Sequence, residues 1–201
     1  MSVFLRKLKL VTSQYPILRG MIAYSIIWPM GSLVQQTIAG RRWDTFDYRR
    51  CLRFSIYGTF FVAPTLYMWV RFSSRMWPAT NLRSGMKKAL IEQATYGPLA
   101  MCAFFFFMPL MEGKGVREAM EETAEKVPKA WKVAVCFWPI FQTINFAYVP
   151  ERNRVPFVAT GSLLWTIFLA YLNQYELEEL KKKKQMAKEK KLKEVQEKLS
   201  N

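Results

Sequence analysis

Histidine is absent from this 201-residue sequence. Histidine is the side chain that most often transfers protons near neutral pH, and it also completes Ser-His-Asp and Cys-His catalytic sites. Its absence excludes those sites, and it excludes histidine-ligated metals within this chain. We find no other pairing of a nucleophile with a base, so we expect that the protein is not an enzyme.

Cysteine is scarce as well, with only Cys51, Cys102 and Cys136 present. The three are far apart in sequence, their number is odd, and no CxxC motif occurs, so neither a zinc site nor a disulfide framework is indicated. Glycine-rich phosphate-binding patterns are missing too. We therefore expect no metal and no nucleotide cofactor.

Acidic residues are half as frequent as basic ones, fifteen against thirty, which gives a net charge of +15. The mean hydropathy of −0.03 is that of a soluble protein, but the charges gather at the N-terminus, in short connectors and in a Lys-rich tail. The apolar runs between them are long enough to cross a bilayer. We interpret the basic residues as topogenic and lipid-headgroup charges, and a nucleic-acid role applies to the tail alone.

The hydropathy pattern predicts an all-α integral membrane bundle of four to five spans in a lipid bilayer. The candidate spans are residues 17–39, 52–70, 89–111, 131–149 and 155–172. The last two are either two complete crossings or one crossing plus a partly buried helix. Prolines inside the spans predict kinks that neighbouring helices must accommodate. The positive-inside rule favours one side with four spans and neither side with five, so it does not decide the orientation.

Three further segments surround or interrupt the membrane bundle, which covers residues 17–175. Residues 1–16 form a basic amphipathic segment that is either a mitochondrial address or an interfacial anchor. Residues 112–129 predict a short surface helix that ends at Pro128. Residues 176–201 form a Lys-rich tail with Glu and Lys four residues apart, which predicts a solvated helix; anionic lipid or RNA binding is the alternative.

Polar residues recur within the first and third spans. In the first, Ser25, Pro29, Ser32 and Gln36 fall on one helical stripe, and we favour packing between helices over the lining of a water-filled passage. The third contains Glu92, Gln93, Gly97 and Pro98, of which Glu92 is the only acid in any apolar run. Because it lies three residues from the start of the span, we expect it among lipid headgroups or paired with an Arg.

The stretch from Trp138 to Arg154 interrupts an apolar run with prolines and amides. Trp138, Gln142 and Asn145 are spaced to share one helical face, which must look at protein or water, and Pro139 lies one residue away. Pro150 is expected to end the helix and to hold Val149 extended. Arg154 follows one turn later, so Pro150 and Arg154 form a hinge at the membrane surface.

These residues resemble the Mpv-seventeen/peroxisomal-membrane-protein-twenty-two family of small integral membrane proteins. The C-terminal motif is the most specific part and consists of Trp138-Pro139, Gln142, Asn145-Phe146, Val149-Pro150, Arg154 and Trp165. Upstream features agree in order: Tyr15-Pro16, Gln35-Gln36, Gly58 with Pro64 and Trp69, Glu92-Gln93, Gly97-Pro98 and Glu112-Gly113. The resemblance covers about residues 15 to 172.

The resemblance implies a four-span protein of the mitochondrial inner membrane, or alternatively of the peroxisomal membrane. In some relatives it implies channel activity and mitochondrial DNA maintenance. The chain departs from the family pattern at Gly31, where an Asp is usual, at Glu92, where Asp is common, and at Phe168, where Tyr is common. The resemblance therefore does not carry over to this chain an ion passage that depends on that Asp.

Two functional hypotheses follow from the residues and the resemblance. The first is a weakly selective channel or solute transporter, lined by Gln36, Gln93, Gln142 and Asn145, with Arg154 and the basic rims concentrating an anionic small solute. The second is a scaffold or assembly factor whose tail recruits a matrix protein such as the mitochondrial ribosome. A homo-oligomer fits either one. The candidate pore or helix-locking residues are Gln36, Glu92, Gln93, Gly97, Pro98, Trp138, Pro139, Gln142, Asn145, Phe146, Pro150, Arg154 and Trp165.

Overall fold

The computed structural model describes residues 3–171 and 185–186. The predicted tail helix at 176–201 lies outside the described residues apart from Gln185 and Met186. The described chain is helical and contains no strand. Its elements in order are α1 (Val3–Gln14), α2 (Ile17–Ile38), α3 (Tyr48–Tyr57), the π-helix η1 (Gly58–Val62), α4 (Ala63–Met76), α5 (Leu82–Ala94), α6 (Tyr96–Met111), α7 (Val116–Tyr148) and a last helix, Glu151–Tyr171.

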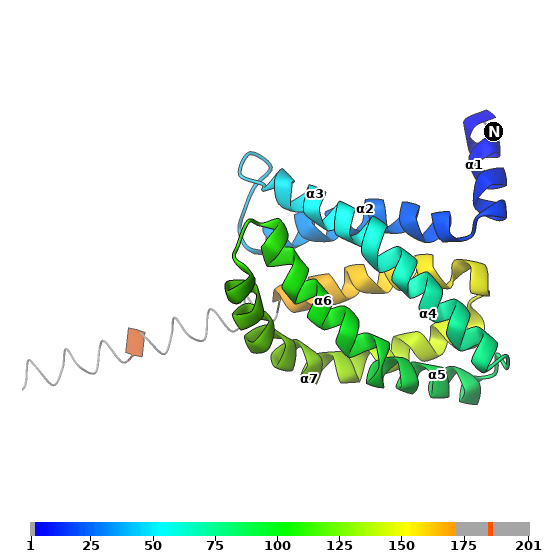
Figure 1. Ribbon diagram of the computed structural model, residues 1–201. Helices are drawn as coiled ribbons and strands as arrows, with labels where there is room; N and C mark the ends of the chain where they lie inside the picture. The colour runs from blue at the N-terminus through cyan, green and yellow to red at the C-terminus, as the bar shows by residue number, and fades with distance from the viewer. Residues whose placement is uncertain (1–2, 172–184, 187–201) are drawn as a thin grey trace, which may run out of the picture.

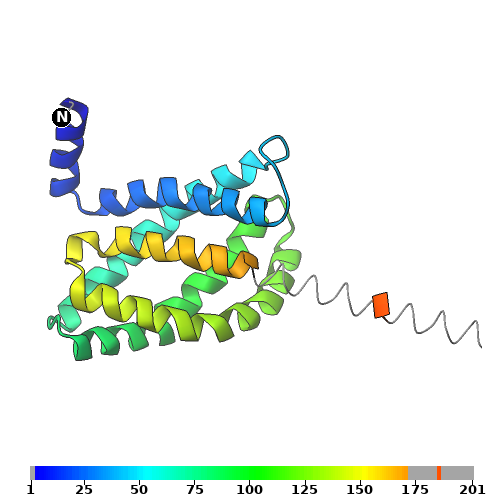
Figure 2. The same ribbon diagram turned by 180° about the vertical axis from the view of Figure 1, so that it is seen from behind.

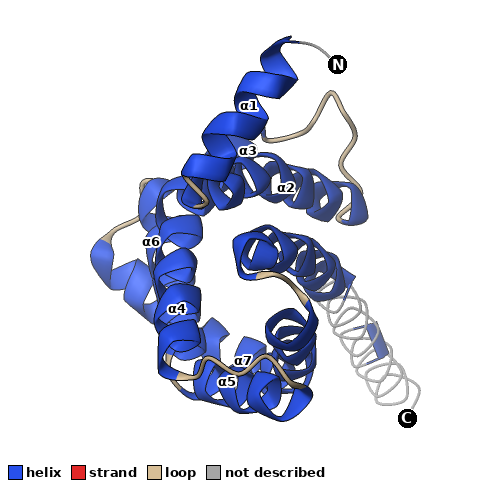
Figure 3. Ribbon diagram, turned by 90° about the vertical axis from the view of Figure 1, so that its right-hand side faces the viewer, coloured by secondary structure: helices blue, strands red, loops and turns tan. Residues whose placement is uncertain are grey.

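These elements form five antiparallel rods within the described residues (Figure 1). The rods are α2, the unbroken series α3–η1–α4, the pair α5–α6, the helix α7, and the last helix. Seen from behind, the last helix runs alongside α7, to which a short connection joins it (Figure 2). Viewed along the rods, they surround a common interior, with α1 standing apart from the bundle (Figure 3).

Two of the described helices, α2 and Glu151–Tyr171, are long and apolar enough to cross a membrane by length and composition. The pair α5–α6 passes the same test as one bent span, with 41° between its halves. The break falls at Thr95, because Pro98 has no N–H to donate to the carbonyl at the end of α5. The membrane-helix prediction is confirmed for these segments.

Pro29 lies inside α2 without ending it. A proline leaves the carbonyl four residues earlier without its helical donor, and here that residue is Ser25. The Ser55 hydroxyl of α3 donates to the Ser25 carbonyl at 3.0 Å. A neighbouring helix therefore supplies the missing bond, as expected for proline within a membrane bundle.

Pro64 follows the π-helix η1, in which the Ala63 N–H donates to the Gly58 carbonyl. A π-turn adds one residue to the helical repeat, so the proline is accommodated by a locally wider turn at the start of α4. The Thr65 hydroxyl donates to the carbonyls of Phe61 and Val62 and also bonds Tyr96 of α6.

The expected end of a surface helix at Pro128 is wrong. Instead, α7 runs unbroken from Val116 to Tyr148 through both Pro128 and Pro139. The carbonyl that Pro128 leaves without a helical donor belongs to Ala124, and both residues are exposed, so water can hydrogen-bond it. Packing of α7 against α5 and α6 then carries the helix past the proline.

The first turns of α7 nevertheless have the charged surface that the sequence predicts. Glu122 accepts hydrogen bonds from Lys114 and Lys126. Both cations lower the pKa of the Glu122 carboxyl, and Lys114 has the larger effect. Further i, i+4 pairs, Arg117 with Glu121 and Lys129 with Glu125, lie along the same exposed surface. Each such pair stabilises the helix only slightly because it is solvated.

Two glycines allow rods to approach closely. A Cβ at Gly85 in α5 would lie 2.9 Å from the backbone oxygen of Thr143 in α7. A Cβ at Gly161 in the last helix would lie 2.4 Å from the Phe141 ring of α7. Small residues at such contacts are the usual means by which membrane helices pack tightly, and here both glycines bring neighbours against α7.

Candidate functional site

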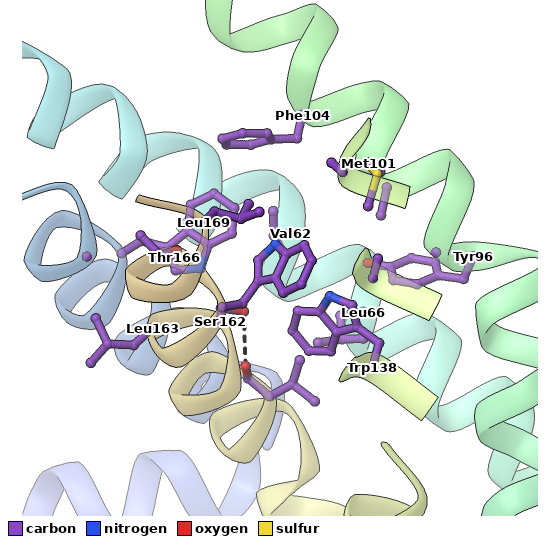
Figure 4. A pocket seen from close by; sticks show the side chains of 18 of the residues that line it. Val62, Leu66, Tyr96, Met101, Phe104, Trp138, Ser162, Leu163, Thr166 and Leu169 are labelled. Carbon is purple, nitrogen blue, oxygen red and sulfur yellow. Dashed lines mark hydrogen bonds between the residues drawn. The ribbon is translucent and has the colours of Figure 1, made fainter. Parts of the chain in front are cut away.

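A cavity of about 200 Å³ lies in the interior of the bundle. It is bordered by residues from every rod, and most of them are aromatic or aliphatic. Figure 4 shows Met101, Phe104 and Tyr96 of α6 on the opposite side of this space from Ser162 and Thr166 of the last helix. An internal cavity with a small number of polar groups is the usual form of a small-molecule site.

Two polar residues that line the cavity, Glu92 and Gln142, belong to a hydrogen-bonded chain that joins three rods. The Trp69 indole of α4 donates to Glu92 Oε2 of α5 at 2.8 Å. Gln142 Nε2 of α7 donates to Glu92 Oε1, and Asn145 Nδ2 donates to Gln142 Oε1 at 2.8 Å. We call Trp69, Glu92, Gln142 and Asn145 the buried network.

Glu92 is therefore not where the sequence suggested. Expected among headgroups or beside an Arg, it is 7% exposed, and both of its carboxylate oxygens accept bonds from the interior of the bundle. The prediction failed because it counted residues from the start of the apolar run, whereas α5 begins earlier, at Leu82. An earlier start places Glu92 in the last turns of a helix that is packed against α7.

Several buried polar atoms near the cavity lack a partner among the described residues. Gln93 Nε2 and Trp28 Nε1 belong to side chains that line the cavity, and Asn145 Oδ1 lies in the buried network. Buried donors and acceptors are normally paired, because leaving one unpaired costs about 1–3 kcal/mol. These atoms are themselves fully buried and do not open on the cavity, so each missing partner is a local cost of the packing around them.

Arg154 is buried rather than exposed at a rim, which corrects the expected surface hinge. Only 3% exposed, it donates from Nη2 to the Phe146 carbonyl at 3.1 Å and from Nε to the Val149 carbonyl at 3.1 Å. These carbonyls end α7, where a cation is favourable. The expectation for Pro150 is confirmed, since α7 ends at Tyr148 and Val149 is extended.

Lys88 is a second buried cation, although it belongs to the basic connector between the predicted spans 52–70 and 89–111. It is 1% exposed and donates to the Ala79 carbonyl at 3.0 Å. Both cations lie over the Phe146 ring, with Lys88 Nζ 5.7 Å and Arg154 Cζ 5.4 Å from the ring centroid. The available signal was the i, i+4 spacing from Lys88 to Glu92, which puts both on one face of α5.

Gln36 is buried but does not face the cavity. Its Oε1 accepts from the Asp47 N–H, and its Nε2 donates to the Asp47 carbonyl and to Ser32. It therefore fixes the loop that leads into α3. These bonds are those of a side chain that packs between helices. Gln36 does not line the cavity that Gln142 lines.

The remaining predicted residues divide between the cavity and the backbone. Gln93, Gly97, Trp138, Gln142 and Trp165 line the cavity. Asn145 and Phe146 are fully buried beside it, while Pro98, Pro139 and Pro150 shape helices. Sequence reasoning missed Trp69 as a partner of Glu92. Its indole ring stacks on Tyr96 at 5.8 Å, a contact between rods that no spacing along the chain reveals.

The buried network predicts energetic coupling between Glu92 and Gln142. Gln142→Leu leaves one Glu92 oxygen and the Asn145 amide without a partner, so we expect a loss of about 2 kcal/mol in the free energy of unfolding. The double variant with Glu92→Leu removes both partners, and its loss should fall short of the sum of the single losses by about 1 kcal/mol. Denaturant unfolding in detergent measures each value.

Gln14→Leu is the matched control for these variants, because Gln14 is an exposed amide at the end of α1. We expect its unfolding free energy to equal that of the unaltered chain within about 0.5 kcal/mol. Strictly additive losses for Glu92→Leu and Gln142→Leu would contradict the coupling.

Comparison with known proteins bears out the resemblance. The Mpv17 / PMP22 family profile matches residues 109–170. Mitochondrial inner membrane protein Mpv17 of Drosophila melanogaster is 30% identical over 131 residues, covering 64% of this chain and 78% of the relative. An Mpv17-like protein of Xenopus laevis is 26% identical over 169 residues, covering 84% and 82%. A search of solved structures found no match. The chain belongs to the Mpv17 / PMP22 family.

Proposed function

We propose that the protein is a weakly selective channel or solute transporter of the mitochondrial inner membrane, with the central cavity as its passage. The observation that carries the proposal is that all five rods border one cavity, in which a few polar groups interrupt an apolar lining. The name of the Drosophila relative supports the mitochondrial inner membrane, and the peroxisomal membrane is the alternative location.

The proposal includes five membrane crossings, one for each rod. Beyond the spans identified by composition, α3–η1–α4 continues without a break alongside α2, and α7 has 33 residues, or about 50 Å of helix. A hydrocarbon core of about 30 Å needs about 20 residues, so the part of α7 after its charged turns suffices. With four crossings, one rod would enter the membrane without crossing it.

Electrostatics support weak rather than strict selectivity. Basic residues at the ends of the rods raise the local concentration of an anionic small solute. Inside the cavity, the Glu92 carboxylate opposes the passage of anions, while buried Lys88 lies one helical turn away on the same helix. Opposite charges one helical turn apart on α5 favour neither sign of solute strongly.

A second function is favoured by a separate observation. Asn145 donates a hydrogen bond to Gln142, and Gln142 donates one to Glu92, as expected of side chains that only hold a bundle together. In this alternative the protein is a scaffold or assembly factor, and its Lys-rich tail recruits a matrix partner such as the mitochondrial ribosome.

Five crossings predict that the two ends of the chain lie on opposite sides of the membrane. Epitope tags at Met1 and Asn201 should therefore differ in protease protection when sealed mitochondria lacking the outer membrane are treated. Equal protection of both tags would indicate an even number of crossings.

A channel predicts that reagents that modify the cavity alter conductance. In a variant without Cys51, Cys102 and Cys136, Ala134→Cys places a thiol at the cavity. A charged methanethiosulfonate reagent should then reduce the conductance of purified protein in planar bilayers. Leu99→Cys is the control, since Leu99 is 71% exposed on α6 and its modification should leave conductance unchanged. Folded protein that gives silent bilayers would reject the channel.

A scaffold predicts dependence on residues 176–201 instead. Deletion of this tail should abolish the recovery of matrix partners while membrane insertion stays intact. A tail in which the lysines are replaced by glutamine keeps the length and tests the charge. Full recovery of partners after deletion would reject the scaffold.

A further inference from the structure

We propose that a groove between α7 and the last helix holds one acyl chain of an anionic phospholipid, whose phosphate is bound by Lys132. The groove has a volume of about 500 Å³ and shares no lining residue with the central cavity. The inference rests on the membrane crossing of α7 proposed above, and it does not depend on whether the protein conducts a solute.

The lining of the groove is apolar throughout. No residue that lines it is charged or carries an amide or a hydroxyl, and the set is Val133, Cys136, Phe137, Ile140, Phe141, Ile144, Leu164 and Phe168. Ile140 is 67% exposed and Leu164 is 55% exposed, so the groove opens on the surroundings of the bundle. A space without polar partners does not hold water well. On helices that cross a membrane, hydrocarbon is therefore its natural content.

Stacked rings give the groove a defined shape. The rings of Phe137 and Phe141 stack with their centroids 5.7 Å apart, and Phe141 also stacks on Phe157 of the last helix at 4.6 Å. Gly161 leaves room for the Phe141 ring against the last helix. A groove that is already formed does not have to be ordered when a chain enters it, so less entropy is lost on binding.

The length of the groove corresponds to one leaflet of a bilayer. From Val133 to Ile144, α7 rises by about 17 Å. The hydrocarbon core is about 30 Å thick, so the chains of one leaflet extend over about 15 Å. Lys132 directly precedes Val133, and residues 133–148 carry no charge. Lys132 therefore lies where the hydrocarbon begins, within reach of the lipid headgroups.

Lys132 is exposed and has no carboxylate partner among the described residues. Lys126 and Lys129, which precede it on α7, each bind a glutamate four residues earlier. The positions four residues before and after Lys132 are Pro128 and Cys136, which cannot pair with it. A lysine at headgroup depth attracts anionic lipid. The cation that α7 leaves unpaired is thus the one that borders the groove.

A second copy of the chain suits this groove less well than an acyl chain does. Helices in membranes pack through small residues, which let their backbones approach. The lining of the groove contains no glycine, alanine or serine. Bulky side chains such as Ile140 and Phe168 would hold another helix at a distance, whereas a flexible acyl chain can follow the uneven surface.

Photoactivatable lipids test the proposal with the full-length protein in phosphatidylcholine nanodiscs. One probe is a phosphatidylglycerol with a diazirine in the middle of one acyl chain, and the other is a phosphatidylcholine with the same chain. Mass spectrometry locates the labelled residues after irradiation. We expect the phosphatidylglycerol probe to label Ile140 and Ile144 more strongly than the phosphatidylcholine probe does. Both should label Leu99 equally, because it is exposed on α6 outside the groove.

Variants separate the headgroup from the chain. Lys132→Gln should lower labelling of the groove by phosphatidylglycerol about fivefold and leave labelling by phosphatidylcholine unchanged. Lys126→Gln is the matched control, because it removes the same charge from the same helix at a lysine that is paired with a glutamate. Cys136→Trp fills the groove and should lower labelling of Ile144 by both probes. Cys102→Trp, at an exposed cysteine outside the groove, should not.

The outcomes distinguish this site from the proposed function. Equal labelling of the groove by both probes would overturn the bound phosphate. Groove residues that neither probe labels would overturn the lipid site, and a dimer that Cys136→Trp converts to a monomer would identify a second copy as the occupant. Preferential labelling by phosphatidylglycerol in a protein that is silent in bilayers would keep the lipid site and reject the channel. Equal protection of the two terminal tags, with no labelling of Ile140, would reject the crossing of α7 and this site with it.

Discussion

The carboxylate of Glu92 is the constraint around which the bundle is arranged. A buried carboxylate is costly unless its oxygens are bonded, and the donors that meet it come from two other rods, the Trp69 indole of α4 and the Gln142 amide of α7. Each donor has a fixed direction, so the rotation of α4 and α7 about their own axes is set by this one group. Gly85, where α7 approaches closely, is also on α5, so a steric constraint is added to the polar one. Together they determine how α5 packs against α7.

Backbone carbonyls inside the bundle also need hydrogen-bond partners. A proline leaves a carbonyl of a membrane helix without its helical donor, and lipid tails cannot donate a hydrogen bond to it. A side chain must therefore donate instead. Ser55 does this for the Ser25 carbonyl in α2, and Arg154 does it for the carbonyls that end α7. Arg154 also donates to the Ser74 hydroxyl of α4 at 2.7 Å, so one side chain joins the end of α7 to a third rod. Residues that look like candidates for ion passage in the sequence are thereby engaged in holding irregular backbone.

This explains how far the sequence could predict the site. Spacing along one helix is set by helical geometry, and the shared face of Trp138, Gln142 and Asn145, the end of α7 before Pro150 and the membrane character of the chain were all predicted correctly. Relations between rods were not, because they depend on rotation and translation that no local pattern encodes. Glu92 was therefore expected among headgroups or beside an Arg, Gln36 was included in a hypothetical passage, and Lys88 was left in a basic connector between two spans, whereas all three are buried. The continuation of α7 through Pro128 was missed for a related reason, since packing on α5 and α6 outweighs the local cost of one lost bond.

The cavity and the buried network meet at Glu92 and Gln142, and this has a consequence for how function and stability are linked. A bundle whose interior is closed by aromatic side chains needs few polar groups to hold together, yet α5 and α7 supply a connected set and leave Gln93 beside it unpaired. The paired members fix the helices in place, and Glu92 and Gln142 line the cavity with hydrogen bonds that join them to each other. Glu92 and Gln93 are thus neighbours in one turn of α5, Glu92 bonded within the network and Gln93 Nε2 without a partner among the described residues. The packing of α5 against α7 and the lining of the cavity therefore depend on the same two side chains, Glu92 and Gln142, so a substitution at either one is expected to change both.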